Sequence, residues 1–471
     1  MLSPRRRGVS TLAAVAVACI LAGCAGPAGH HPHHTPRPRP SSRPTASPTP
    51  ALAASWPVYH RDPGRSGNSP GTPAFTSLAT AWRANLDGAV WAEPLVVGGE
   101  VIAATENDTL YALNPQTGSV VWQDHVGTPV PASDLPCGDI FPLGMTGTPA
   151  YDPITQSIFV VAEETGPIHV LYAFNARTGA VRWSRQVDIA VSSEYANAVQ
   201  QRTALAVANG YVYFGFGGLD GDCSQYRGAV VAVPTGGQGS TLDYVVPTSR
   251  EGAVWATGGP VVGSSGQIFV STGNGAAVSG AWDGSDSVLE FSPTLQLVGE
   301  FAPAQWAYDN AHDLDLGSVS PTLLPDGFLF IAGKSGLGYV LRASALGGIG
   351  GQVSSSRVCQ GAMAFGGTSF QGDTLYLACA NGLEAISVAP GGTFSVLWQT
   401  ASGANGPPVL GGGSVVSADT NDGNLIVLNA SSGAEEGQIG VGSLPHFTSP
   451  ALDGDLAMVP TYSGVTAISG V

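Results

Sequence analysis

Leu110-Tyr-Ala-Leu-Asn-Pro-Gln-Thr-Gly-Ser-Val-Val-Trp122 and Leu171-Tyr-Ala-Phe-Asn-Ala-Arg-Thr-Gly-Ala-Val-Arg-Trp183 follow one pattern, Tyr-Ala-x-Asn-x-x-Thr-Gly-x-Val-x-Trp. Each stretch is preceded by two short apolar runs joined by a turn, and such runs, bounded by Gly, Asn and Pro, are typical of β-strands. Looser copies of the opening strands recur to the end of the chain. Together with Pro94 and Pro149, the starts fall at Thr203, Gly259, Ser320, Thr368, Pro407 and Ser449, about 40 to 60 residues apart.

Eight such units predict an all-β protein, an eight-bladed β-propeller with four-stranded blades, because four short strands and their turns need about this length. The eighth unit ends one strand short, at Val471. An orphan strand, residues 80–86, precedes the first unit, and its Trp82 resembles the Trp that ends other units. Pairing this N-terminal strand with the last blade closes the ring and removes two exposed edges. This count favours eight blades over seven.

Four tryptophans are interpreted as structural, because the Trp that ends a unit is expected to wedge between neighbouring blades. They are Trp82, Trp122, Trp183 and Trp398. A buried Trp removes roughly 150–250 Å² from water, so these rings are expected to stabilise the ring of blades.

Composition agrees with a β protein outside the cell. The 471 residues include 65 Gly and 35 Pro, and only 11% are charged. Six Arg and no acidic residue precede residue 56, which leaves 12 basic and 34 acidic residues, a net charge of −22, in the remainder. A domain this acidic repels phosphate backbones, so nucleic acid is excluded as a partner.

Residues 1–23 are similar to a bacterial lipoprotein signal peptide. A basic run, Arg5-Arg6-Arg7, precedes an apolar stretch, residues 11–22, that is too short to span a bilayer. The stretch ends in Leu21-Ala22-Gly23-Cys24, which resembles the lipobox. The resemblance implies that Cys24 is the lipidated first residue of the mature protein; an ordinary signal peptide with an incidental Cys is the alternative.

Residues 24–55, which begin with the lipidated Cys24, are expected to form a disordered tether. The segment is rich in His, Pro, Arg and Ser, and such a composition cannot bury a core. Its four His could bind a metal weakly, but a solvated spacer is favoured. We therefore expect one propeller domain, residues 56–471, anchored through lipid to the extracytoplasmic face of a bacterial cell membrane.

The four cysteines of the domain suggest two disulfides, as in other exported proteins. Three pairings are possible. We favour Cys359–Cys379, which lie within one repeat, and Cys137–Cys223, which lie in two long loops. None has the spacing of a zinc site.

The repeated tails resemble the tryptophan-docking repeat of dehydrogenases that depend on pyrroloquinoline quinone (PQQ), with Asn114 and Asn175 where that family often has Asp. The segment Trp56-Pro-Val-Tyr-His-Arg-Asp-Pro-Gly-Arg-Ser-Gly67 is similar to the N-terminal segment of the family. The same repeat occurs in non-enzymatic propellers, including the lipoprotein subunit of the bacterial outer-membrane assembly machine. The resemblance therefore implies the fold and leaves the activity open.

The resemblance also implies a cofactor site. Trp255 matches the floor under the quinone, Asn274 the amide ligand of Ca²⁺, Asp313 or Asp315 the base, and Lys334 the basic residue that contacts the quinone. Ca²⁺ prefers oxygen ligands, and the base takes a proton from an alcohol. Lys334 is the only lysine of the chain.

Two departures weaken this assignment. The chain has no vicinal cysteine pair, and the family's Glu ligand has no clean counterpart, because Gly218-Leu-Asp220-Gly-Asp222-Cys occupies that region with a different length. Asn and Asp also serve turns, and Trp255 also fits a core position.

Three functions follow as hypotheses. The leading one is a monomeric binding or scaffolding propeller that holds a protein or small-molecule ligand near its central channel or on its loop face. The rival is a PQQ- and Ca²⁺-dependent quinoprotein dehydrogenase that oxidises an alcohol or a sugar-like substrate. The third is an extracellular polymer or glycan binder that uses exposed aromatic side chains such as Trp282 and Trp306.

Overall fold

The computed structural model describes residues 51–189, 196–400 and 403–470, and all of them fall in one compact unit. The signal peptide, Cys24 and nearly all of the tether lie outside the described residues. No helix within the described ranges is long and apolar enough to cross a membrane.

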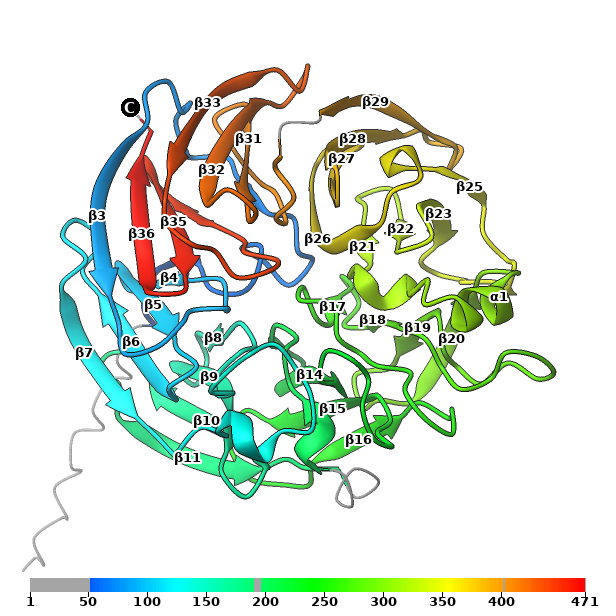
Figure 1. Cartoon of the computed structure of the whole chain (residues 1–471), viewed down its shortest axis with the longest axis horizontal. Coiled ribbons are helices and arrows are strands. Elements are labelled where there is room, and N and C mark those ends of the chain that lie inside the picture. Colours follow the sequence, from blue (N-terminus) through cyan, green and yellow to red (C-terminus); the bar gives the residue numbers. More distant parts are fainter. Residues whose placement is uncertain (1–50, 190–195, 401–402, 471) are drawn as a thin grey trace, which may run out of the picture. The chain divides into compact units, whose positions relative to one another are not determined.

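The described strands form eight sheets arranged around a ring, so the prediction of an eight-bladed β-propeller is confirmed (Figure 1). Blade 1 contains β4 (Leu95–Val97), β5 (Glu100–Ala104), β6 (Thr109–Leu113) and β7 (Val120–His125), and blade 2 contains β8 (Ala150–Asp152), β9 (Ser157–Glu164), β10 (Ile168–Asn175) and β11 (Val181–Gln186). Blade 3 contains β12 (Val199–Gln200), β13 (Ala206–Ala208), β14 (Tyr211–Gly218), β15 (Ala229–Pro234) and β16 (Leu242–Val245). Blade 4 contains β17 (Val261–Val262), β18 (Ile268–Thr272), β19 (Ser287–Phe291), β20 (Leu297–Ala302) and β24 (Gly348–Ile349).

The other half of the ring is built in the same way. Blade 5 contains β21 (Thr322–Leu323), β22 (Phe328–Ala332), β23 (Leu337–Arg342) and β25 (Ser354–Arg357), and blade 6 contains β26 (Ala364–Gln371), β27 (Thr374–Cys379), β28 (Gly382–Val388) and β29 (Phe394–Thr400). Blade 7 contains β30 (Val409–Gly411), β31 (Ser414–Asp419), β32 (Asn424–Asn429) and β33 (Glu435–Gly440), and blade 8 contains β34 (Ala451–Asp453), β35 (Leu456–Thr461) and β36 (Gly464–Ser469). The helical elements with bounds in the described ranges are α1 (Trp306–Ala311) and the 3-10 turns η1 (Ala132–Asp134), η3 (Leu316–Ser318) and η4 (Cys359–Gly361), and residues 196–198 also have 3-10 conformation.

The N-terminal strand β3 (Ala79–Asn85) completes blade 8. It pairs antiparallel with β36 as the outermost strand, with Trp82 opposite Ala467. The sequence prediction of ring closure by this strand is therefore confirmed. Closure leaves the first and last segments of the domain hydrogen-bonded to each other, which removes two sheet edges.

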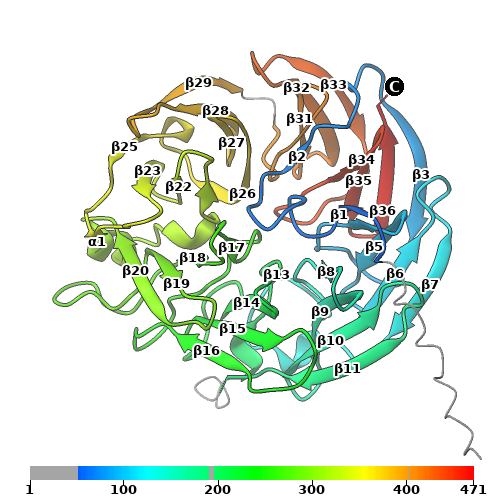
Figure 2. The same cartoon turned by 180° about the vertical axis from the view of Figure 1, so that it is seen from behind.

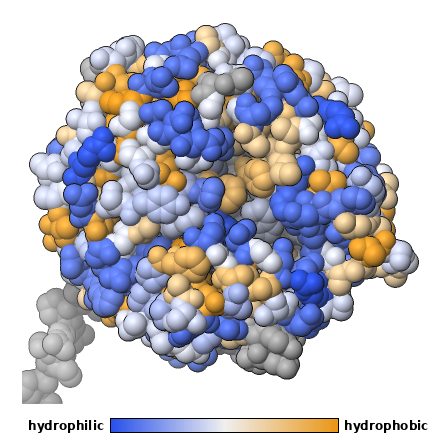
Figure 3. All heavy atoms as spheres, viewed as in Figure 1, coloured by the Kyte–Doolittle hydropathy of each residue, from blue (hydrophilic) through white to orange (hydrophobic). Residues whose placement is uncertain are grey.

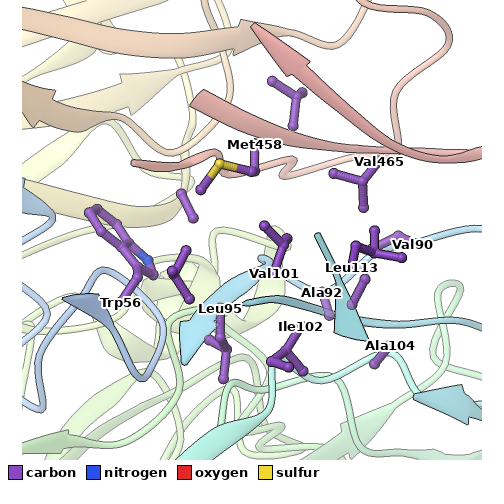
Figure 4. Close-up of a cluster of buried hydrophobic side chains, with 14 of the residues drawn as sticks. Trp56, Val90, Ala92, Leu95, Val101, Ile102, Ala104, Leu113, Met458 and Val465 are labelled. Carbon is purple, nitrogen blue, oxygen red and sulfur yellow. The ribbon is translucent and has the colours of Figure 1, made fainter. Parts of the chain in front are cut away.

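The middle strands of the blades are buried on both faces, because each blade is covered by its two neighbours. All five residues of β6 are buried, whereas the outer strand β7 alternates between exposed and partly buried positions. Figure 4 shows the contact between two blades, where Met458 and Val465 of blade 8 face Val101 and Leu113 of blade 1. The apolar runs of the sequence thus become the contacts between the blades.

The four predicted tryptophans lie against glycines of the following blade. A Cβ on Gly118 would lie 2.5 Å from the Trp82 ring, and one on Gly179 would lie 2.4 Å from the Trp122 ring. The same arrangement pairs Trp183 with Gly237 and Trp398 with Gly433. The Thr-Gly of the repeated tail is therefore the platform on which the Trp of the preceding blade packs.

The segment before β3 crosses the centre of the ring on the face seen in Figure 2. Its strands β1 (Ala54–Trp56) and β2 (Asn68–Ser69) pair with the innermost strands of blades 1 and 7. Between them, His60 Nδ1 lies 2.9 Å from Thr368 O in blade 6, and the buried Arg65 donates to the carbonyls of Leu205 and Pro260, which directly precede β13 and β17. This segment fills the channel on that face.

Both predicted disulfides are present. Cys137 and Cys223 join the loop before blade 2 to the β14–β15 connection, with Cα atoms 6.2 Å apart. Cys359 and Cys379 join η4 to the end of β27, with Cα atoms 5.5 Å apart.

Candidate functional site

A cavity of about 90 Å³ opens on the face opposite the N-terminal segment, where turns and connections of blades 3, 4 and 5 converge. This is the face seen in Figures 1 and 3, and Figure 3 shows it hollowed near its centre with hydrophilic residues around much of the hollow. Of the five residues that the family resemblance assigns to a cofactor site, four line the cavity: Trp255, Asn274, Asp315 and Lys334. The fifth, Asp313, contacts Lys334 from the rim.

Lys334 is held by two aspartates. Its Nζ lies 2.5 Å from Asp315 Oδ2 and 2.7 Å from Asp313 Oδ1. The Asp315 side chain is 9% exposed and that of Asp313 is 69% exposed. The sequence does not distinguish the two aspartates, but their environments differ. Asp315 is the buried partner of Lys334, and Asp313 is its solvent-exposed partner.

Asn274 ties the two aspartates together. Its backbone N–H donates to Asp315 Oδ1 (2.6 Å), and its Nδ2 donates to Asp313 Oδ1 (2.9 Å). The preceding residue must be glycine, since a Cβ on Gly273 would lie 2.2 Å from Asp315 Oδ1. The remaining amide oxygen, Asn274 Oδ1, is buried and has no hydrogen-bond partner in the described part of the chain. An unpaired buried oxygen is unusual in a native protein and often indicates a missing water or ion.

Trp255 forms one wall, and two cations lie near its ring. Lys334 Nζ is 5.7 Å from the ring centroid and Arg202 Cζ is 5.8 Å from it. Phe447, from the connection between blades 7 and 8, approaches to 6.2 Å between centroids. An aromatic face with cations at these distances is a cation–π arrangement.

Carboxylates outnumber cations in the lining. Asp220, Asp222, Glu251 and Asp315 line the cavity, against Arg202 and Lys334. Burial raises the pKa of Asp315, although Lys334 opposes the shift. Burial also raises the pKa of Glu251; Arg250 opposes this shift, whereas Asp222 and Asp315 add to it. Burial would lower the pKa of Lys334, but its two aspartates outweigh burial and raise it.

The rim of the cavity is stabilised by the Cys137–Cys223 disulfide. A Cβ on Gly221, one of the lining residues, would lie 3.8 Å from Cys137 Sγ. Tyr226 donates its hydroxyl to Asp222 Oδ1, and Arg250 Nη2 donates to the Asp222 carbonyl (2.6 Å). The disulfide, the Tyr226 hydroxyl and the Arg250 guanidinium therefore all hold the acidic β14–β15 connection in place.

Sequence reasoning missed three lining residues: Arg202, Tyr226 and Glu251. None belongs to a recognisable motif, and each comes from a connection whose course the repeat does not specify. The expectation that Trp306 is exposed for glycan binding is wrong, because this first residue of α1 is 7% exposed. Trp282 is partly buried, and its Nε1 donates to Ser285 O (2.7 Å).

The closed ring and its loop-face cavity define the chain as an eight-bladed β-propeller. The family model described as outer membrane protein assembly factor BamB matches residues 77–215 and 146–299. Together with the repeat pattern, this match supports a PQQ-repeat β-propeller. No curated protein matches the sequence.

Solved structures of two kinds are similar to this one. The quinohemoprotein alcohol dehydrogenase ADHIIG from Pseudomonas putida HK5 has a TM-score of 0.68 at 14% identity, over 88% of this chain and 80% of that one. A europium-containing methanol dehydrogenase has a TM-score of 0.67 at 15% identity, over 90% and 99%. BamB from Moraxella catarrhalis has a TM-score of 0.58 at 15% identity, over 84% and 100%. At these identities the likeness shows the fold alone.

Proposed function

We propose that this protein is a binding propeller, held by lipid on the extracytoplasmic face of the cell membrane, whose loop-face cavity takes a small organic cation. One observation carries the proposal: the lining presents four carboxylates and only two cations, one of which, Lys334, is already paired with Asp313 and Asp315. A positive ligand relieves the repulsion among these carboxylates, and the Trp255 ring offers it an aromatic face.

The N-terminal segment supports a one-sided site. Trp56, His60 and Arg65 are buried across the centre of the opposite face, which favours entry of a ligand from the loop face. The lipid anchor and the monomeric state belong to the proposal as well; they rest on the lipobox-like residues up to Cys24 and on a ring whose sheet edges are closed by β3.

The test is calorimetric titration of the purified protein with 1,4-diaminobutane at low ionic strength. We expect saturable binding that weakens at least tenfold in Trp255→Ala and in Asp222→Asn, and that weakens with added salt. Asp243→Asn, an exposed acidic residue on β16, is the matched control and leaves binding unchanged. Absence of binding, or equal weakening in the control, overturns the proposal.

A quinoprotein dehydrogenase is the second candidate, and the unpartnered Asn274 Oδ1 favours it. With Asp315, this oxygen is a ligand of the type that Ca²⁺ prefers. The rest of the site does not fit the quinone: the cavity of about 90 Å³ is smaller than the roughly 300–1,000 Å³ of most ligand sites, and its surplus of carboxylates repels a polycarboxylate.

One experiment separates the two candidates. PQQ is added to the protein with and without Ca²⁺, and the quinone absorbance and the reduction of a dye by an alcohol are followed. The binding proposal predicts no dye reduction under either condition. Saturable quinone binding that requires Ca²⁺ and is lost in Asn274→Ala establishes the dehydrogenase instead.

A further inference from the structure

The turn that carries Lys334 is held from outside the cavity. Residues 333–336 connect β22 to β23, and the segment 358–364 of the chain runs beside them. Val358 N–H donates to Gly336 O (3.0 Å), and Ala364 N–H donates to Gly333 O (3.2 Å). The segment thus bridges both ends of the Lys334 turn.

The same segment is linked to the partner of Lys334, Asp315, through Ser318. Ser318 Oγ lies 3.1 Å from Asp315 O and 2.8 Å from Ala364 O, and Lys334 N–H donates to Asp315 O (2.9 Å). The position of segment 358–364 therefore determines where both members of the Lys334–Asp315 ion pair lie.

Segment 358–364 does not adopt this path by its own preference. Cys359 and Gln360 have φ values of 55° and 51°, in the left-handed region that non-glycine residues avoid at roughly 1–2 kcal/mol each. Two groups of blade 6 hold them there. The disulfide to Cys379 fixes the Cys359 side chain, and the Glu384 carboxyl of β28 lies beside the disulfide, where the backbone N–H groups of Cys359 and Gln360 lower its pKa.

The surroundings of Glu384 fit a role in stabilising the conformation of Cys359 and Gln360. It is 1% exposed and lies beside the disulfide, with its ligand oxygen within 4.8 Å of both sulfur atoms. Its Oε2 has no hydrogen-bond partner among residues 51–470 apart from the two gaps. Burial raises the pKa of this carboxyl, whereas the backbone N–H groups of Cys359 and Gln360 oppose the shift; a Gln side chain keeps the shape and an acceptor oxygen.

We infer that Glu384 and the Cys359–Cys379 disulfide are positioning elements for Lys334: by holding η4 in its left-handed conformation, they keep the ammonium group between Asp313 and Asp315. This inference deepens the proposed function, because a displaced Lys334 frees the aspartates and changes the charge that a ligand meets. It concerns blade 6, no residue of which lines the cavity.

Lys334 can be followed directly because it is the only lysine of the chain. Acetic anhydride modifies uncharged amines, and mass spectrometry of the peptide that contains Lys334 separates its labelling from that of the N-terminus. The ion pairs keep the wild-type amine protonated at pH 9, so its labelling is slow. Each unit by which its pKa falls raises the labelling rate about tenfold.

The variants are chosen to separate positioning from folding. Glu384→Leu, which keeps the disulfide, and the double variant Cys359→Ser/Cys379→Ser are expected to label at least tenfold faster than the wild type. Glu384→Gln, which keeps an acceptor oxygen, is expected to label at the wild-type rate. Glu290→Leu, a buried Glu on the third strand of blade 4, is the matched control and also labels at the wild-type rate.

The labelling needs no ligand, so its outcome is independent of the diaminobutane titration. Wild-type labelling rates in Glu384→Leu, measured on protein that retains its circular dichroism spectrum, overturn the inference. Fast labelling in Glu384→Gln also overturns it, because a role confined to hydrogen-bond acceptance survives that replacement.

Discussion

The docking of Trp82 on Gly118 yields a prediction that tests both the ring closure and the meaning of the repeated Thr-Gly. The indole is 7% exposed, and its Nε1 donates to Pro115 O (2.6 Å). Burial of about 150–250 Å² corresponds to about 4–6 kcal/mol as an upper bound. Replacement of a buried Trp by Ala typically lowers the free energy of unfolding by about 3–5 kcal/mol, and we expect this range for Trp82→Ala.

The sharper perturbation is Gly118→Ala, alone and combined with Trp82→Ala. Gly118 has a φ of 69°, so alanine there costs about 1–2 kcal/mol through its backbone conformation alone. Its Cβ would also lie 2.5 Å from the Trp82 ring and displace it. In the Trp82→Ala background the ring is absent and only the backbone cost remains. The two substitutions are therefore expected to be non-additive by about 1–3 kcal/mol.

Equilibrium unfolding in urea, followed by circular dichroism with both disulfides intact, measures all four corners of this cycle. Gly413→Ala is the matched control, since Gly413 has a φ of 84° and its Cβ would meet no atom within 4 Å. Its effect should be the same with and without Trp82. If Gly118→Ala destabilises both backgrounds equally, the ring does not pack on Gly118, and the closure argument loses its energetic basis.

Three further predictions concern the stability of the fold. Burial raises the pKa of Glu93 from 4.5 to about 8, so the folded protein keeps a proton that the unfolded chain releases; stability falls by up to about 1.4 kcal/mol per pH unit between pH 5 and 8, and urea midpoints should show a smaller fall in Glu93→Gln. The double variant Cys137→Ser/Cys223→Ser, whose cysteines are 86 residues apart, should lose about 2–5 kcal/mol in the same assay. Arg65→Met leaves the carbonyls of Leu205 and Pro260 without their donor, and hydrogen exchange should become faster in the N-terminal segment than in blade 6.

The fold could be predicted from the sequence because its signals are local and repeated. Residues 110–122 contain a strand, a turn and the Trp that ends the unit, and residues 171–183 repeat the same pattern. Closure could be predicted because an orphan strand and an incomplete last unit complement each other. The path of the N-terminal segment could not, because His60 reaches Thr368 and Ser449, residues more than 300 positions away, through contacts that no pattern encodes.

The candidate site was only partly visible in the sequence. Trp255, Asn274 and Lys334 stand in segments that resemble a known family, so their meeting could be expected. Nothing in the sequence distinguished Asp313 from Asp315, since the difference lies in burial, which the packing of η3 against β18 and β22 determines. Trp306 was misjudged for the same reason: a Trp in a long connection looks exposed until the helix that it begins is packed.

The location of the site also predicts that Lys334 contributes to stability. The outer strands of blades 3, 4 and 5, namely β16, β20 and β25, contain no Trp to dock on the next blade. The Lys334–Asp315 pair lies where these blades meet, and replacing one partner of a buried pair leaves an uncompensated charge. We therefore expect Lys334→Met to lower the free energy of unfolding by about 3–5 kcal/mol. Asp313→Asn, which removes only the exposed partner, should cost less than about 1 kcal/mol. Equal effects of the two substitutions in urea unfolding would mean that the buried aspartate is solvated, and the cavity would then be an open surface rather than a site.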